Sequence, residues 1–207
     1  MKRLLLILLV PLLLVSCART HRFTLGENGA YTDTRTDISY TLLDAFFEPA
    51  ARGEEWGKYE SRENNFVRTF YTVGALDPAL FLADDARCLY YAGSETLCPE
   101  SWTVTAALLC LEDATSVEQK RFTAKDNANV IEELRTLWFT GEGNAERPLF
   151  EEPVLTRRVK LMFSEYEGIY YCFTFVVYEG GEAYFYEIAE RRTVAVPEAL
   201  AELLQNG

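Results

Sequence analysis

The chain has 207 residues, of which 49% are hydrophobic, 14% aromatic and 25% charged. This composition is typical of a globular protein that buries a core, and it excludes a disordered, collagenous or low-complexity chain. Acidic residues outnumber basic residues by 32 to 20. The field of the protein therefore repels phosphate backbones, and nucleic acid is not an expected partner.

The first 16 residues have the features of an export signal. Lys2 and Arg3 give the segment a basic start, and residues 4–15 are apolar apart from Pro11. A helix needs about 20 apolar residues to cross a bilayer, and this run is shorter. We therefore expect a cleaved signal peptide at residues 1–16 rather than a membrane-spanning anchor.

The motif at the end of this segment is more specific. Leu14-Val15-Ser16-Cys17 resembles the lipobox of bacterial lipoprotein precursors, in which an aliphatic and a small residue precede a cysteine. The resemblance implies cleavage before Cys17, acylation of its thiol, and a mature chain held at the cell membrane, facing outside the cytoplasm. The lipid bilayer is then the expected partner of Cys17, because acyl chains contribute ~0.8 kcal/mol for each buried CH₂.

The mature chain is expected to begin with a tether and to continue as one folded domain. Residues 17–37 comprise the lipidated cysteine and a polar, Gly- and Thr-rich stretch without sustained periodicity, which is typical of a flexible linker. Residues 38–207 are long enough for a single domain, either undivided or built as two packed halves at about 38–141 and 152–207.

The first half of this domain is expected to contain mainly strands. Apolar and polar residues alternate at the start of 38–47, and 66–73 has a β-rich composition, so strands are predicted in both, whereas the charged residues 52–65 are expected to form a loop. Asp77-Pro78 predicts the start of a short helix. Further strands are expected at 87–91, 95–98, 101–111 and 117–123.

Two helices and a β-meander complete the expected fold. Residues 127–139 follow a capping pattern and place their apolar side chains in one stripe, and a C-terminal helix is expected after Pro197. The strands of the meander are expected at 154–163, 169–178 and 183–189. Strands in runs, punctuated by helices, favour a two-layer α+β fold in which amphipathic helices pack on one face of an antiparallel sheet.

Four cysteines follow Cys17 in the chain. A three-residue turn at 92–94 would place Cys88 directly opposite Cys98 in a hairpin, and export permits a disulfide between them. Cys110 and Cys172 lie in the most apolar strands, where cysteine behaves as a small hydrophobic residue. The alternative, four unpaired thiols, stays open at this point.

Histidine- and zinc-dependent chemistry is not expected. The single histidine, His21, falls in the tether, so no imidazole is expected in a structured cleft to activate a serine or cysteine. The cysteine spacing matches no zinc site and no glycine-rich nucleotide motif is complete, so neither a metal nor a cofactor is expected. Carboxylate chemistry is not excluded, because a glycosidase needs only two suitably spaced acids.

The acidic body contains few clusters of basic residues. Two cations share one face of a predicted strand and two follow the last strand of the meander, which makes them candidates for holding a small anionic ligand. These candidates are Arg158, Lys160, Arg191 and Arg192. The alternative, which the sequence favours, is that they form ion pairs with Glu187 and Glu190 across the meander.

Two classes of function remain. The first is a membrane-tethered, non-enzymatic module that binds or senses an envelope protein or glycan, using the tyrosine-rich meander for stacking on sugars. The second is a cell-envelope glycan hydrolase with paired carboxylates. Two acids facing each other in a deep, aromatic-lined cleft would favour the hydrolase, whereas scattered acids on a shallow surface would favour binding.

The lipobox predicts that the mature protein carries lipid on Cys17. When the full-length precursor is made in a bacterium, the product is expected to partition into detergent, and mass spectrometry is expected to find an acylated N-terminal cysteine. The Cys17→Ser variant is expected to lack lipid. A wild-type product that stays in the aqueous phase would contradict this prediction.

Overall fold

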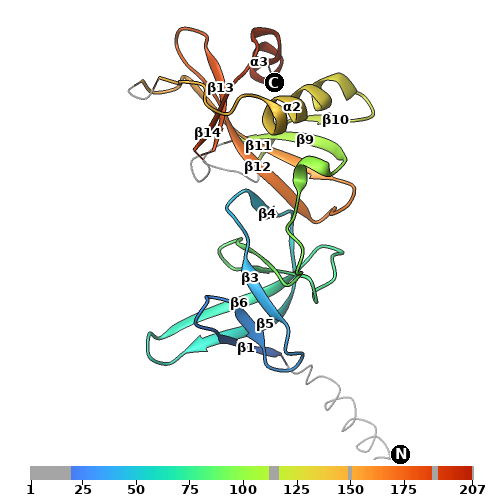
Figure 1. Ribbon diagram of the computed structural model, residues 1–207, viewed down its shortest axis with the longest axis vertical. Coiled ribbons are helices and arrows are strands. Elements are labelled where there is room, and N and C mark those ends of the chain that lie inside the picture. The colour runs from blue at the N-terminus through green and yellow to red at the C-terminus, as the bar shows by residue number, and fades with distance from the viewer. Residues whose placement is uncertain (1–19, 112–116, 149–150, 188–190, 207) are drawn as a thin grey trace, which may run out of the picture.

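The computed structural model describes residues 20–111, 117–148, 151–187 and 191–206. These residues form two lobes stacked along the long axis of the molecule, a closed barrel and a second sheet that carries the helices (Figure 1). Strands make up 46% of the structure and helices 14%. The expected two-layer α+β domain is therefore wrong, because seven strands between His21 and Tyr91 form a closed barrel and the chain is mainly β.

Seven strands form the barrel, in the order β1-β2-β3-β8-β7-β6-β5, and parallel pairing of β1 with β5 closes it. The other neighbouring strands are antiparallel. Closure pairs both edges of what would otherwise be an open sheet. The bounds are β1 His21–Leu25, β2 Tyr31–Asp33, β3 Ser39–Leu42, β5 Arg52–Ser61, β6 Phe66–Val73, β7 Phe81–Asp84 and β8 Leu89–Tyr91.

Aromatic rings fill the interior of the barrel. Phe70 is fully buried, and its ring centroid lies 4.4 Å from that of Phe23 and 5.3 Å from that of Tyr90. The hydroxyl of Tyr90 donates a hydrogen bond to the buried carboxylate of Asp84. Tilted and edge-on contacts between rings add stability beyond the burial of their area, so the barrel has a core of its own.

The first two barrel strands come from the segment expected to be a flexible tether. In β1 the Nδ1 of His21 lies 2.5 Å from the Oδ2 of Asp33 in β2, and the imidazole stacks on Trp56 at 4.3 Å. Asp33 is completely buried and also accepts hydrogen bonds from the backbone of Arg35 and the hydroxyl of Thr36. The tether boundary at residue 37 is therefore wrong. Strands of five and three residues are too short to show a period in the sequence.

Two further expectations in this lobe are wrong. Residues 52–65 are not a loop, because β5 runs through Arg52–Ser61 with many of its charged side chains exposed on the outer face of the barrel. Asp77-Pro78 begins a turn and not a helix, because the N–H groups of Leu80 and Phe81 both donate to the Asp77 carbonyl and β7 follows at once. Residues that were expected to form the helix instead form β7, which pairs with β6 and β8 of the barrel.

The hairpin expected around residues 92–94 is absent. Strand β8 pairs with β3 and β7, and residues 92–98 form no strand before the 3₁₀-helix η1 (Pro99–Ser101). Cys88 is half-buried, Cys98 is exposed, and both thiols are free in the structure, so the geometric reason for a disulfide between them is lost. Cys110 and Cys172 are buried thiols, as the apolar strands predicted.

The second lobe is an antiparallel sheet with the strand order β10-β9-β11-β12-β13-β14. The predicted meander is confirmed as β11, β12 and β13, which pair in chain order. The remaining strands extend the sheet on both sides of it. The bounds are β9 Val104–Leu111, β10 Glu118–Thr123, β11 Leu155–Phe163, β12 Ile169–Val177, β13 Ala183–Glu187 and β14 Arg192–Ala195.

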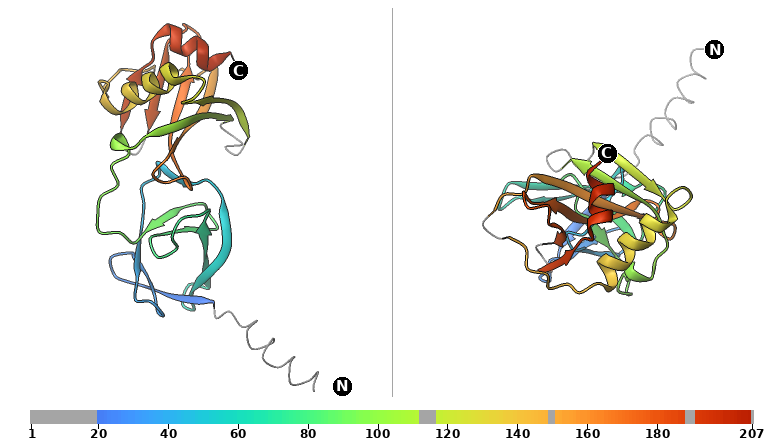
Figure 2. Two further views of the ribbon diagram at one scale, coloured as in Figure 1. Left: turned by 90° about the vertical axis from the view of Figure 1, so that its right-hand side faces the viewer. Right: turned by 90° about the horizontal axis from the view of Figure 1, so that it is seen from above.

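The two amphipathic helices are confirmed as α2 (Ala128–Thr140) and α3 (Glu198–Gln205). Both lie on the same side of the second sheet (Figure 2), and their buried side chains share one core with apolar residues of the sheet. The ring of Trp138 in α2 stacks on Phe173 of β12 at 4.3 Å. Because successive strand residues point to opposite faces, Arg158 and Lys160 of β11 and Thr174 of β12 lie on the side away from the helices.

Strand β4 (Phe47–Pro49) joins the two lobes. It follows β3 of the barrel along the chain and pairs with the first residues of β12 in the second sheet. Phe46 and Phe47 each place their ring 5.5 Å from that of Tyr171. Some buried apolar residues of the barrel strands, including Val73, Phe81 and Leu89, consequently share one cluster with the second lobe across this junction.

The remaining residue of β4 presents a carboxylate to two cations. Glu48 Oε2 lies 2.6 Å from Lys160 Nζ, and Glu48 Oε1 lies 3.2 Å from the Arg158 guanidinium. The side chain of Lys160 is only 2% exposed. Burial acts to raise the pKa of Glu48, but the hydrogen bond and charge of Lys160, together with Arg158, outweigh it and hold this pKa below its usual range.

Loss of the buried lysine is expected to destabilise the protein. Lys160→Met keeps the side-chain length but leaves Glu48 paired with Arg158 alone, and we expect a loss of about 2 to 3 kcal/mol in the free energy of unfolding. Lys58→Met breaks an exposed pair with Glu55 and is expected to cost less than about 1 kcal/mol. Urea unfolding at neutral pH measures the free energy of unfolding of both variants. Equal losses in the two variants would contradict the prediction that the buried pair contributes more stability than the exposed one.

Acid is expected to weaken the barrel through Asp33. Burial acts to raise the pKa of Asp33, but hydrogen bonds from the Arg35 backbone, His21 and Thr36 outweigh it and lower this pKa. A lowered folded-state pKa contributes stability that is present above the ordinary pKa and lost as the pH falls through the folded value, here below about pH 4. Unfolding free energies measured down this range are expected to fall less steeply for Asp33→Asn than for the wild type. The exposed control Asp85→Asn is expected to keep the wild-type slope, and an unchanged slope for Asp33→Asn would overturn the prediction.

Candidate functional site

Two of the four candidate cations are held by an acid from another part of the chain. Arg158 and Lys160 lie on one face of β11, as their spacing predicted, and both contact Glu48 of β4. The structure thus pairs them with Glu48 rather than with Glu187, and Glu190 lies outside the described residues. Lys160 is enclosed, whereas the Arg158 side chain remains 20% exposed.

Arg192 has a structural role at the end of α2. Its Nε donates a hydrogen bond to the carbonyl of Trp138 at 2.9 Å, and its Nη2 donates to the carbonyl of Gly141 at 2.8 Å. The last carbonyls of a helix lack partners within the helix and carry partial negative charge, so a guanidinium stabilises them. These two contacts hold the Arg192 side chain at the end of α2.

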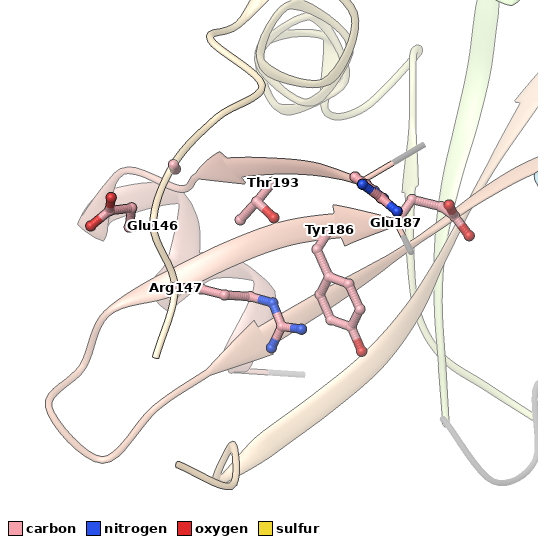
Figure 3. A pocket seen from close by; sticks show the side chains of 7 residues that line it. Glu146, Arg147, Tyr186, Glu187 and Thr193 are labelled. Carbon is pink, nitrogen blue, oxygen red and sulfur yellow. The ribbon is translucent and has the colours of Figure 1, made fainter. Parts of the chain in front are cut away.

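Arg191 lines a half-open cavity of about 510 Å³ (Figure 3). The cavity lies where the loop after α2 passes β13 and β14, and the backbone of Ala145 donates to the Thr193 carbonyl in this contact. The residues that line it are Ala145, Glu146, Arg147, Tyr186, Glu187, Arg191 and Thr193. This cavity therefore brings a second arginine next to one of the predicted cations.

Arg147 is held in this cavity by two tyrosines. Its guanidinium carbon lies 4.5 Å from the ring centroid of Tyr186, and its Nη1 donates a 2.9 Å hydrogen bond to the hydroxyl of Tyr178. Figure 3 shows the guanidinium and the Tyr186 ring side by side. A guanidinium has five N–H donors, and the described residues engage one of them. The others are free to bind a carboxylate or phosphate with charge-assisted hydrogen bonds.

The two acids of the cavity do not form a catalytic pair. Figure 3 shows the carboxylates of Glu146 and Glu187 on opposite sides of the pocket, with Arg147 and Tyr186 between them. Glu146 is exposed, and Glu187 is buried opposite Arg192 in the pairing of β13 with β14. Paired hydrolytic carboxylates must flank one bond of the substrate. Glu146 and Glu187 are therefore not arranged as such a pair.

A second cavity of about 410 Å³ lies at the junction of the lobes. Its apolar wall comes from rings that are themselves mostly buried, namely Phe46, Phe47, Trp138, Phe139 and Tyr171. Asp44 and Glu100 also line it, and both are exposed. Arg192 is the cation that lines this cavity, and the carbonyls at the end of α2 already engage it.

A third cavity, of about 480 Å³, lies on the barrel beside β1 and β5. His21 lines it, which corrects the premise that the only histidine lies outside the fold. Within the described residues, the imidazole contacts Asp33 and Trp56, and no serine or cysteine is hydrogen-bonded to it. These two contacts therefore hold the start of β1 against the rest of the barrel.

Within the part of the chain that the structure describes, no group of three or more His, Cys, Asp or Glu residues is placed to hold a metal ion. No helix among those residues is both long enough and apolar enough to cross a membrane. Cys17, the predicted lipidation site, lies outside them.

The sequence did not indicate Arg147. It stands in a Gly-, Glu- and Pro-rich loop in which no pattern marks one residue above another, and its partners Tyr178 and Tyr186 looked like members of a general aromatic row. The contact forms only when residues 143–145 pair with Thr193 of β14.

No protein-family model, no curated protein and no solved structure matches the chain. The function is therefore inferred from the chemistry of the cavity and from the N-terminal motif.

Proposed function

We propose that the mature protein is a lipid-anchored module, outside the cytoplasmic membrane, that binds a carboxylate-bearing sugar of the cell envelope in the cavity of Arg147. The observation that carries the proposal is the guanidinium of Arg147 held over the ring of Tyr186 in a cavity that also contains Arg191. Aromatic faces stack on sugars, and arginines bind carboxylates with two parallel hydrogen bonds. The cavity combines both kinds of group.

Charge supports a specific role for this cavity. The mature chain carries 32 acidic residues, so an anionic ligand is repelled over most of its surface. Arg147 and Arg191 bring two positive charges into this cavity, beside the carboxylates of Glu146 and Glu187. The hydroxyl of Thr193 adds a neutral donor and acceptor on the same wall.

The shape of the molecule supports the proposed anchoring. Strand β1 begins four residues after Cys17 and lies in the lower lobe, whereas the Arg147 cavity belongs to the upper lobe (Figure 1). A lipid on Cys17 would therefore place the barrel next to the bilayer and the cavity farther from it. Such an arrangement suits a module that captures envelope glycan above the membrane.

Binding is tested with two sugars that differ in one group. N-acetylmuramic acid carries a carboxylate that N-acetylglucosamine lacks. Calorimetric titration of a chain beginning at residue 18, which keeps every described residue, is expected to show binding of the first sugar only. Arg147→Ala is expected to weaken it at least about tenfold, because a hydrogen bond to a charged group contributes about 1.5 to 3 kcal/mol.

The matched control is Arg52→Ala, which removes an arginine of the barrel that interacts with Tyr71 and the Asp85 carbonyl. It is expected to leave binding unchanged. Equal binding of the two sugars, or full binding by Arg147→Ala, would refute the proposed site. Release of reducing sugar ends from glycan incubated with the protein would instead support the hydrolase.

A further inference from the structure

We infer that the Arg147 cavity is one end of a longer binding face, and that the ligand is a sugar chain that carries carboxylates at intervals rather than a single sugar. This inference rests on the proposed function and extends it. The evidence is a row of side chains that begins in the cavity and crosses the second sheet on the side away from the helices.

The strand register places this row. Residues directly opposite each other on neighbouring antiparallel strands point to the same face. Tyr186 of β13 lies between Thr193 of β14 and Thr174 of β12, and Thr174 in turn lies opposite Arg158 of β11. The complete row, from β14 to β10, is Thr193, Tyr186, Thr174, Arg158, Cys110 and Glu118.

The face that carries the row is not the core face of the sheet. Phe173 and Phe175, which flank Thr174 in β12, are fully buried in the cluster that includes the helices, so Thr174 points away from them. Thr193, Tyr186, Thr174 and Arg158 are all partly exposed. These four side chains are therefore accessible to a ligand, whereas Cys110, the next residue of the row, is buried.

The first three residues of the row offer unused hydroxyl groups. Within the described residues, the hydroxyls of Thr193, Tyr186 and Thr174 have no hydrogen-bond partner. A hydroxyl both donates and accepts, which suits the hydroxyl and amide groups of sugars. The Tyr186 ring, with Arg147 packed against it, is the aromatic surface at the start of this polar path.

Arg158 of β11 supplies a cation next to Thr174 in the row. Its Nη2 contacts Glu48 and the carbonyl of Ala45, and within the described residues its Nε and Nη1 have no partner. Lys160 satisfies the other oxygen of Glu48, so Arg158 is not the only counter-charge of that acid. Arg158 is consequently free to share a ligand carboxylate without leaving Glu48 unpaired.

The spacing along the row requires a ligand longer than one sugar ring. Adjacent strands lie ~4.8 Å apart, so the backbones at Tyr186 and Arg158, two strands apart, are separated by about 10 Å. A ligand that reaches both Arg147 and Arg158 therefore spans at least two sugar units. An extended peptide is less suited to this path, because peptides that add to sheets run along a strand edge and the row crosses the strands.

The test compares sugar chains of different length on a chain beginning at residue 18. The ligands are N-acetylmuramic acid, glycan fragments of two and four alternating N-acetylglucosamine and N-acetylmuramic acid units without peptide, and a neutral chain of four N-acetylglucosamine units. We expect the four-unit acidic fragment to bind at least tenfold more tightly than the single acidic sugar. The neutral chain is expected to bind no more tightly than that sugar.

Two conservative variants test whether the tighter binding of the longer fragment depends on the row. Thr174→Val removes a hydroxyl at constant shape, and Arg158→Lys keeps the positive charge beside Glu48 while removing the two-pronged donor. Both variants are expected to lose most of the extra affinity for the four-unit acidic fragment. Their affinity for the single acidic sugar is expected to equal that of the wild type. Thr41→Val and Arg52→Lys, on the barrel, are the matched controls and are expected to keep the gain.

Each outcome has one meaning. Binding of the single acidic sugar without any gain in the longer fragment overturns the extended face and leaves the proposed function standing. A gain that survives in Thr174→Val, or that the neutral chain reproduces, also overturns it, and Thr174→Val decides this even when Arg158→Lys fails to fold. If no acidic fragment binds, both proposals fail.

Discussion

The joining of the two lobes depends on one carboxylate, that of Glu48. It lies on the short strand β4 and contacts both Lys160, whose side chain is almost completely enclosed, and Arg158, which remains partly exposed. A buried lysine without a counter-charge costs several kcal/mol, so the second sheet requires an acid at this point. The pairing of β4 with β12 brings the acid there and sets the rings of Phe46 and Phe47 against Tyr171 in the same step.

A buried carboxylate also stabilises the barrel, at the point where the chain enters it. Asp33 is fully buried, and His21, the Arg35 backbone and Thr36 satisfy its two oxygens. This contact holds β1 between β2 and β5, and the parallel pairing of β1 with β5 then closes the barrel. In the proposed anchored protein, the strand nearest the lipid is thus firmly held, which keeps the connection between bilayer and fold short.

The candidate site arises from segments that are separate in the sequence. The loop after α2 contributes Arg147, β13 contributes Tyr186, and the turn before β14 contributes Arg191. Strand alternation was enough to predict that Arg158 and Lys160 share a face, because that relation is local. It did not predict that Glu48 partners them, because the pairing of β4 with β12 joins residues far apart in the chain.

By itself, the sequence determined the elements whose signals are local. Alternation with Gly-rich turns defined the meander, an apolar stripe defined α2, and the prediction of a lipid at Cys17 rests on the N-terminal motif alone. Only the tertiary structure decided the barrel, the position of His21 and the meeting of Arg147 with Tyr186. A short strand has too few residues to show a hydrophobic period in the sequence. The sequence around a charged side chain also does not indicate which distant residue it will contact, because the fold brings the two together.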